Sequence, residues 1–297
     1  MNSHGLDCSR VPQVVSRPVK VQRFTAGGVL LFPEWERIAG MKRYIRLFRN
    51  VVNWWKHFAV KIGVNRENPV VFHLRNGVTL EVPVILYHEF KEIFLEDCYL
   101  QGLEESLPDA PIVLDIGANA GFFSLYLASI RPRARIVCCE PIPVNFAQLS
   151  RNKAINPNLD ITTLPVAVYG RSGSMTLQLQ WEDALSTAAT VLPIEGRIPM
   201  DVPCISLKDL IDRHDLDRVD LLKMDCEGSE YSILYRCPAE YLKRIGKMAA
   251  EVHIGSEPDH NIAALSSFLT ARGFRIQTAG HMLWALSIDW QRREVRS

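Results

Sequence analysis

The feature that most constrains the fold is a short apolar run that turns at a glycine. The run Val113-Leu114-Asp115-Ile116 is followed by Gly117-Ala118-Asn119-Ala120-Gly121, and a helix-prone segment begins there. A glycine lets the backbone turn sharply and approach a ligand with no Cβ in the way. The amides that open the next helix then face that ligand. This pattern predicts a strand, a ligand-binding turn and a helix, which is the first unit of an α/β sheet.

The chain continues to alternate between strand and helix patterns after this unit. Strands are expected at residues 112–116, 135–140, 161–168, 219–225, 248–252, 274–278 and 282–287. Helices are expected at residues 120–129, 144–155, 229–242 and 263–272. This alternation predicts βαβ units and a mostly parallel sheet. Residues 170–203 interrupt the alternation, with an expected hairpin at 175–180, and they predict an insertion that is functional or flexible.

The front of the chain is strongly basic. Residues 1–66 hold twelve Lys or Arg against three Asp or Glu. Apolar residues recur there at steps of three and four, namely Ile38, Met41, Ile45, Phe48, Val52 and Trp55. The recurrence predicts an amphipathic helix over about residues 36–61. Two interpretations stay open, which are packing on the catalytic domain or on a second subunit of a homodimer, and attachment to a membrane surface or an acidic partner.

A hairpin is predicted between this basic segment and the alternating region. Two β-prone runs within residues 70–82 flank Asn76-Gly77, a pair that favours a type I′ turn, and a helix is expected from about residue 89 to residue 105. The sequence therefore divides into a basic tail and helix (1–66), a hairpin and helix (67–110), and a core domain (111–290) with its insertion at 170–203.

Composition narrows the class of protein. Hydrophobic residues make up 47% and charged residues 23%, which is typical of a globular chain, and a net charge of +1 gives no global case for nucleic-acid binding. Seven cysteines without regular spacing favour reduced thiols. The first residues lack the apolar core of a signal peptide, and no run is long enough to span a membrane. These features predict a cytoplasmic protein.

Glu140 adds a second element to the ligand site. It ends the second expected strand, 25 residues after Asp115, where a carboxylate can accept both ribose hydroxyls. The glycine spacing is GxxxG and not the GxGxxG of dinucleotide-binding folds. Asp115 beside the turn suits the amino-acid end of S-adenosylmethionine better than a pyrophosphate. An NAD-type oxidoreductase remains the alternative, because such enzymes also place an acid at this strand end.

Together these segments resemble the FkbM family of S-adenosylmethionine-dependent methyltransferases. The most specific match is Lys223-Met224-Asp225-Cys226-Glu227-Gly228-Ser229-Glu230, joined by Glu140-Pro141 and Glu251-Val252-His253. The resemblance runs from about residue 70 to residue 287. It implies a class I (Rossmann-like) seven-stranded, mostly parallel sheet with helices on both faces and a reversed last strand. It also implies O-methylation of a hydroxyl or carboxyl oxygen on a small molecule, sugar or peptide natural product, although a non-catalytic scaffold recruited through the basic helix is a further alternative.

The resemblance also assigns cofactor roles by position. Residues expected to contact S-adenosylmethionine are Asp115, Gly117, Asn119, Gly121 and Asp225 near the methionine end, Glu140 at the ribose, Pro141, Ala167 and Val168 at the adenine, and Tyr99 as a roof.

The expected catalytic residues are Asp225, Glu227 and His253, which follow neighbouring strands. An alcohol acceptor must lose a proton, and an imidazole with a pKa of about 6.5 suits that task, so His253 is the predicted general base. Asp225 and Glu227 are expected to orient the acceptor, or to hold a divalent ion, although a metal-free site is favoured. Residues expected to contact the acceptor are Lys223, Glu251, Trp181 and Ser186.

Overall fold

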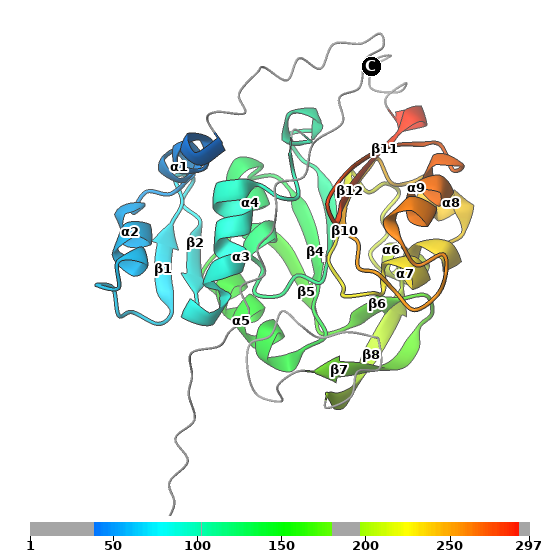
Figure 1. The fold of residues 1–297 in the computed structure, drawn as a ribbon, viewed down its shortest axis with the longest axis horizontal. Coiled ribbons are helices and arrows are strands. Elements are labelled where there is room, and N and C mark those ends of the chain that lie inside the picture. Colours follow the sequence, from blue (N-terminus) through cyan, green and yellow to red (C-terminus); the bar gives the residue numbers. More distant parts are fainter. Residues whose placement is uncertain (1–38, 102, 180–196, 291–297) are drawn as a thin grey trace, which may run out of the picture. The chain divides into compact units, whose positions relative to one another are not determined.

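A seven-stranded sheet forms the centre of the computed structural model (Figure 1), which describes residues 39–101, 103–179 and 197–290. Its strands lie in the order β11-β12-β10-β9-β3-β4-β5. Their bounds are β3 (Ile112–Ile116), β4 (Arg135–Cys139), β5 (Asp160–Leu164), β9 (Leu221–Met224), β10 (Lys247–Glu251), β11 (Phe274–Ala279) and β12 (Met282–Ser287). Strand β12 is antiparallel to β10 and β11, and the other neighbours are parallel. The predicted mostly parallel sheet with a reversed last strand is confirmed.

Helices cover both faces of the sheet because its central strands are apolar on both sides. Val113 and Cys138 pack toward α4 (Phe122–Ile130) and α5 (Pro143–Ala154). Leu114 and Cys139 pack on the opposite face. The helices of that face are α6 (Leu207–Arg213), α7 (Glu230–Arg236), α8 (Ala239–Leu242) and α9 (Ile262–Thr270). Helix α6 was not predicted, and the helix expected at 229–242 is divided into α7 and α8.

The front segment contains several short elements. They are α1 (Ala39–Asn50), α2 (Trp55–Lys61), β1 (Val70–His73), β2 (Thr79–Val82), η1 (Val84–Leu86), α3 (Tyr87–Lys91), the π-helical turn η2 (Glu92–Glu96) and η3 (Glu104–Ser106). The predicted single helix at 36–61 is therefore two helices in its described part. The helix expected at 89–105 is confirmed only as far as Glu96, because the chain leaves the helical conformation at Asp97, whose φ is 56°.

The predicted hairpin is confirmed as β1 and β2, paired antiparallel. Its turn is not type I′, because a type I′ turn needs positive φ at both central residues and only Gly77 has one. The hairpin is fixed to the core by two asparagines of the α5 region. Asn156 Oδ1 accepts from the amide of Thr79 and Asn152 Oδ1 accepts from the amide of Glu81, each at 2.8 Å.

The insertion forms a second, three-stranded sheet. Its strands β6 (Ala167–Tyr169), β7 (Gly173–Leu179) and β8 (Ile198–Ser206) lie in the order β6-β8-β7. The strand expected at 161–168 is thus two strands in two sheets. Strand β7 pairs with the distant β8 and not within a local hairpin at 175–180. This sheet has a small core of its own, in which Leu179 of β7 and Val202 of β8 pack with Ile142 from the segment after β4.

No helix within the described ranges is long and apolar enough to cross a membrane.

Candidate active site

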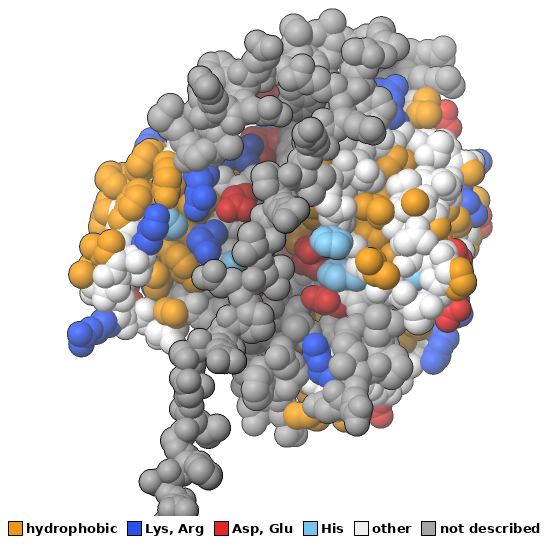
Figure 2. Space-filling view, in the orientation of Figure 1, with side chains coloured by type: hydrophobic (Ala, Val, Ile, Leu, Met, Phe, Trp, Pro, Cys, Tyr) orange, Lys and Arg blue, Asp and Glu red, His pale blue; other side chains and the backbone are white. Residues whose placement is uncertain are grey.

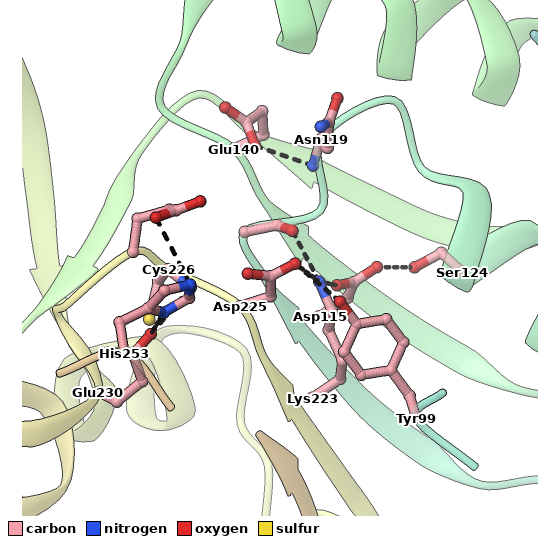
Figure 3. Close-up of polar contacts among 12 residues, drawn as sticks. Tyr99, Asp115, Asn119, Ser124, Glu140, Lys223, Asp225, Cys226, Glu230 and His253 are labelled. Atoms are coloured by element: carbon pink, nitrogen blue, oxygen red, sulfur yellow. Dashed lines mark hydrogen bonds and ion pairs between the residues drawn. The ribbon is translucent and has the colours of Figure 1, made fainter. Parts of the chain in front are cut away.

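A cavity of about 330 Å³ lies at the carboxyl ends of β3, β4 and β9, where open α/β sheets bind their ligands. Predicted site residues that line it are Gly117, Asn119, Glu140, Pro141, Ala167, Val168, Lys223, Asp225, Glu227, Glu251 and Tyr99. Figure 3 shows how the polar members of this set lie relative to one another. Segments predicted separately along the chain therefore meet around one space that is large enough for a small ligand.

The turn after β3 depends on Gly117. Its φ is 72°, and a Cβ placed there would lie 1.7 Å from the backbone oxygen of Asp225. Its amide, like that of Ala118, donates to the carbonyl oxygen of Cys139 at 3.0 Å. Only glycine allows the β3 turn and the segment after β9 to approach so closely. This approach brings the turn and the segment after β9 to one cavity.

Glu140 faces the cavity from the end of β4. Its carboxylate accepts hydrogen bonds from the amides of Asn119 (2.8 Å) and Ile142 (2.9 Å), which fix its position. Burial raises the pKa of Glu140 to about 7, although these two amides oppose the shift.

Asn119 has a φ of 48°, and among the described residues its buried Oδ1 has no hydrogen-bond partner. An acceptor atom of this kind at the cavity is a place for a ligand to donate a hydrogen bond.

Asp115 does not line the cavity, contrary to the prediction. Its side chain is fully buried beneath the turn, where one oxygen lies 3.3 Å from Lys223 Nζ and the other accepts from Ser124 Oγ at 2.7 Å. Lys223 is also buried and donates to the carbonyl oxygen of Gly117 at 2.7 Å. Burial disfavours the charged ammonium, yet the charges of Asp115 and Asp225 raise the pKa of Lys223. Lys223, predicted to contact the acceptor, therefore holds the turn in place.

Gly121 is also absent from the cavity wall. A Cβ at this position would lie 2.5 Å from Leu149 Cδ1 of α5. The residue allows α4 to start close to α5, so its role is in packing and not in ligand contact.

Asp225 is positioned by an aromatic residue from the front segment. Tyr99 Oη donates to Asp225 Oδ2 at 2.7 Å, and Lys223 Nζ lies 4.0 Å from the same oxygen. Tyr99 is buried and lines the cavity, which agrees with its predicted place near the cofactor. It lies in a turn and not in the predicted helix.

His253 lies behind Glu227 and is not part of the cavity wall. Its Nδ1 is 3.0 Å from the buried carboxylate of Glu230 (Figure 3). Its Nε2 is 3.5 Å from Glu227 Oε2. Burial favours the neutral ring, but the hydrogen bond to Glu230 and the charges of Glu230 and Glu227 raise the pKa of His253 to about 9. The imidazole is therefore protonated at neutral pH, a form that cannot accept a proton. The structure argues against His253 as the general base.

Of Glu227, Glu230 and His253, Glu227 is the residue that lines the cavity. Burial raises its pKa to about 7, and the charge of His253 opposes the shift. A carboxylate that titrates near neutral pH suits a general base. Asp225, Glu227 and His253 also offer ligand atoms within 4.8 Å of one another, a spacing at which a divalent ion could bind.

The front segment supplies a wall that the sequence did not reveal. His88, Glu89 and Glu92 of α3 and η2 line the cavity, opposite the strand ends that carry Glu251 and Asp225. Burial raises the pKa of Glu251 to about 7, helped by the charge of Asp225, and burial is the chief cause that raises the pKa of Glu89 and Glu92. No local motif marks these glutamates, because only the tertiary fold brings them to the site. The predicted acceptor contacts Trp181 and Ser186 lie outside the described residues.

Comparison with known proteins identifies the class to which this fold and site belong. The model of the FkbM methyltransferase domain matches residues 115–276, which is more than half of the chain. The methyltransferase sdnD of Sordaria araneosa is 30% identical over 227 residues, covering 66% of this chain and 84% of that protein. The protein is therefore a methyltransferase, and it belongs to the FkbM family.

Two further relatives have names that describe their acceptors. The 31-O-demethyl-FK506 methyltransferase FkbM of Streptomyces tacrolimicus is 25% identical over 224 residues, covering 66% of this chain and 84% of that protein. The hexuronic acid methyltransferase AglP of Haloferax volcanii is 25% identical over 156 residues, covering 52% of this chain and 61% of that protein.

Proposed function

We propose that this protein is an S-adenosylmethionine-dependent O-methyltransferase that acts on a hydroxyl group of a sugar or another polyhydroxylated small molecule. The observation that carries the proposal is the single cavity at the carboxyl ends of β3, β4 and β9, with Glu140 at one side and Asp225 and Glu227 at the other. The sheet order, with its one reversed strand, supports a class I methyltransferase fold.

The chain offers a fitting set of groups for the cofactor. Glu140 is held by two amides with its carboxylate toward the cavity, where it would accept the ribose hydroxyls. Asn119 Oδ1 is a buried acceptor for the donors of the amino-acid end. S-adenosylmethionine, when bound, supplies a methyl group on a positively charged sulfur. Asp225 and the glutamates around the cavity stabilise positive charge at that end of the site.

The charge of the cavity favours a hydroxyl acceptor over a carboxylate. Glu89, Glu92 and Glu251 line the space together with Asp225 and Glu227. An acceptor carboxylate would add a further negative charge beside these groups, where the charges of Asp225 and Glu92 already contribute to the raised pKa values of Glu251 and Glu89. Carboxylates accept hydrogen bonds from hydroxyl groups readily. The name of the FK506 relative indicates methylation at an oxygen, whereas a hexuronic acid, named for the other relative, carries both hydroxyl groups and a carboxylate.

Glu227 is proposed to take the proton from the acceptor. It lines the cavity, titrates near neutral pH and lies beside the protonated ring of His253. His253 positions Glu227. The carboxylate of Glu230 in turn fixes the His253 ring by its contact with Nδ1 of that ring. Methyl transfer is an in-line displacement, so the remaining task of the protein is to orient the acceptor oxygen.

The proposal is tested first at the cofactor. Titration calorimetry with S-adenosylhomocysteine should show binding to the wild type and at least a roughly tenfold loss in Glu140→Ala, because hydrogen bonds to a charged carboxylate are lost. Glu257→Ala removes an exposed carboxylate outside the cavity and serves as the control. Equal affinity in wild type and Glu140→Ala would contradict the assigned cofactor site.

The acceptor is tested with a panel of neutral sugars, sugar acids and their glycosides, monitored by mass spectrometry for a gain of one methyl group. Methylation of hydroxyl positions that is lost in Glu227→Gln, with S-adenosylhomocysteine binding intact, would support both the acceptor class and the base. Formation of methyl esters would refute the hydroxyl assignment.

A further inference from the structure

The front helices expose the described part of the apolar stripe that the sequence analysis identified, namely Ile45, Phe48, Val52 and Trp55. In α1 and the residues after it, Leu47 and Val51 are fully buried against the core. Ile45, Phe48 and Val52, spaced by three and four residues, point the other way, and Ile45 is 52% exposed. Leu47 and Val51 lie on one side of this helical segment, and Ile45, Phe48 and Val52 lie on the other. The segment therefore has two apolar faces. The inward face packs on the core, whereas on the outward face Phe48 contacts Trp54 and Phe58 and is still 39% exposed.

The exposed residues form one continuous patch. Phe48 and Trp54 have ring centroids 4.9 Å apart, and Trp54 and Trp55 have centroids 6.1 Å apart. Trp55 is 54% exposed. Figure 2 shows hydrophobic side chains gathered over α1 and α2, with Lys and Arg side chains beside them. We call Ile45, Phe48, Val52, Trp54 and Trp55 the apolar patch. A large exposed apolar patch of this kind marks an interaction site.

The surroundings of the apolar patch are positively charged. Residues 39–66 contain seven Lys or Arg and no Asp or Glu. Arg49 is exposed next to the patch on α1, and Arg75 donates to the carbonyl oxygen of Phe48 at 2.9 Å. Arg46 and Lys56 are paired with Asp97 and Glu67, which come from later segments. The partner of this surface must therefore accept apolar side chains and carry negative charge.

We propose that the apolar patch and its basic rim bind the surface of an anionic phospholipid bilayer. Tryptophan and phenylalanine beside Lys and Arg are the side chains that settle at the boundary between acyl chains and headgroups. The rings of the two adjacent tryptophans combine an apolar body with a polar N–H, which suits the boundary between acyl chains and headgroups. Since α1 packs on η2, and Glu92 and Ile93 of η2 line the cavity, docking would hold the active site close to the lipid surface.

The test is co-sedimentation of the full chain with vesicles. One set of vesicles is phosphatidylcholine alone, and the other contains roughly one-third phosphatidylserine, which provides the negative surface. The wild type should bind the anionic vesicles and bind the neutral ones weakly. Arg49→Gln should weaken binding about fivefold, the contribution of one basic residue near an anionic surface. Ile45→Ser/Trp55→Ser should weaken it at least about tenfold, because the buried apolar area is lost.

Ile198→Ser/Arg275→Gln is the control, because it removes one exposed aliphatic and one exposed basic side chain from β8 and β11, outside the front segment. S-adenosylhomocysteine binding by each variant reports folding. Absence of vesicle binding by the wild type would overturn the proposal and leave an acidic protein as the partner to test. An equal loss of binding in the control and in the patch variant would also overturn it. Neither result bears on the proposed methyl transfer.

Discussion

The buried pair of Lys223 and Asp115 gives the sharpest test of the structural argument. Both side chains are almost fully buried and their charged atoms lie 3.3 Å apart. Replacing Lys223 with Met keeps the approximate volume but leaves the carboxylate without its cation and the carbonyl of Gly117 without its donor. Removing one partner of a buried ion pair costs about 3–5 kcal/mol. Lys223→Met should therefore lower the free energy of unfolding by about that amount, out of a typical total of about 5–15 kcal/mol.

The double variant Lys223→Met/Asp115→Asn separates charge from packing. Asparagine removes the negative charge and can still accept from Ser124. The double variant should regain at least about half of the stability lost in Lys223→Met, because no buried charge is then left unpaired. Asp115→Asn alone should cost less than Lys223→Met, since Asp225 remains 4.0 Å from the ammonium.

Urea denaturation followed by circular dichroism measures these differences at one pH and one protein concentration. A loss below about 1 kcal/mol in Lys223→Met would refute the structural role, because that value is typical of an exposed pair. If the variant were stable but bound the acceptor poorly, the original expectation that Lys223 contacts the acceptor would be restored.

Three further predictions follow from the site and its supports. Gly117→Ala should abolish binding of S-adenosylhomocysteine in calorimetry, because its Cβ would overlap the backbone of Asp225; retained binding would contradict the turn geometry. The rate constant kcat/KM should rise with pH through about 7 as Glu227 loses its proton, and this rise should be smaller in Glu227→Gln, in which Glu140 and Glu251 still titrate near 7; an unchanged profile would exclude Glu227 as the base. Asn152→Ala should cost about 1–3 kcal/mol in thermal or urea unfolding, because the amide of Glu81 loses its acceptor; no change would mean that the hairpin is held by other contacts.

Most of the central sheet was predictable because its pattern is local. Each apolar run is followed by a turn and a helix, and five of the seven strands of the sheet agree with the expected bounds to within one residue. Prediction failed where the outcome depends on distant partners. Strand β7 has the same local pattern as a hairpin, but its partner β8 lies beyond residue 196.

The sequence predicted most of the residues that lie at the site, but it predicted less well what each of them does there. The sequence indicated that Asp115, Lys223 and His253 belong near the ligand. It could not show that Lys223 neutralises Asp115 below the turn, or that Glu230 holds a proton on His253, because burial and pairing are tertiary properties. Prediction from the apolar stripe of α1 is limited in the same way. Periodicity reveals the apolar faces of a helix, but it does not indicate which face is covered by the rest of the protein.

Tyr99 has a consequence for how this enzyme could be recombined with its relatives. Its hydroxyl donates to Asp225, while its backbone oxygen accepts from Trp284 Nε1 of the reversed strand at 2.8 Å. A single turn residue thus joins the front segment, the catalytic edge and the far side of the sheet. Chimeras that exchange the front segment to alter acceptor choice should keep Tyr99 on the same parent chain as Asp225 and Trp284, which makes a crossover before the β1–β2 hairpin more promising than one after Leu100.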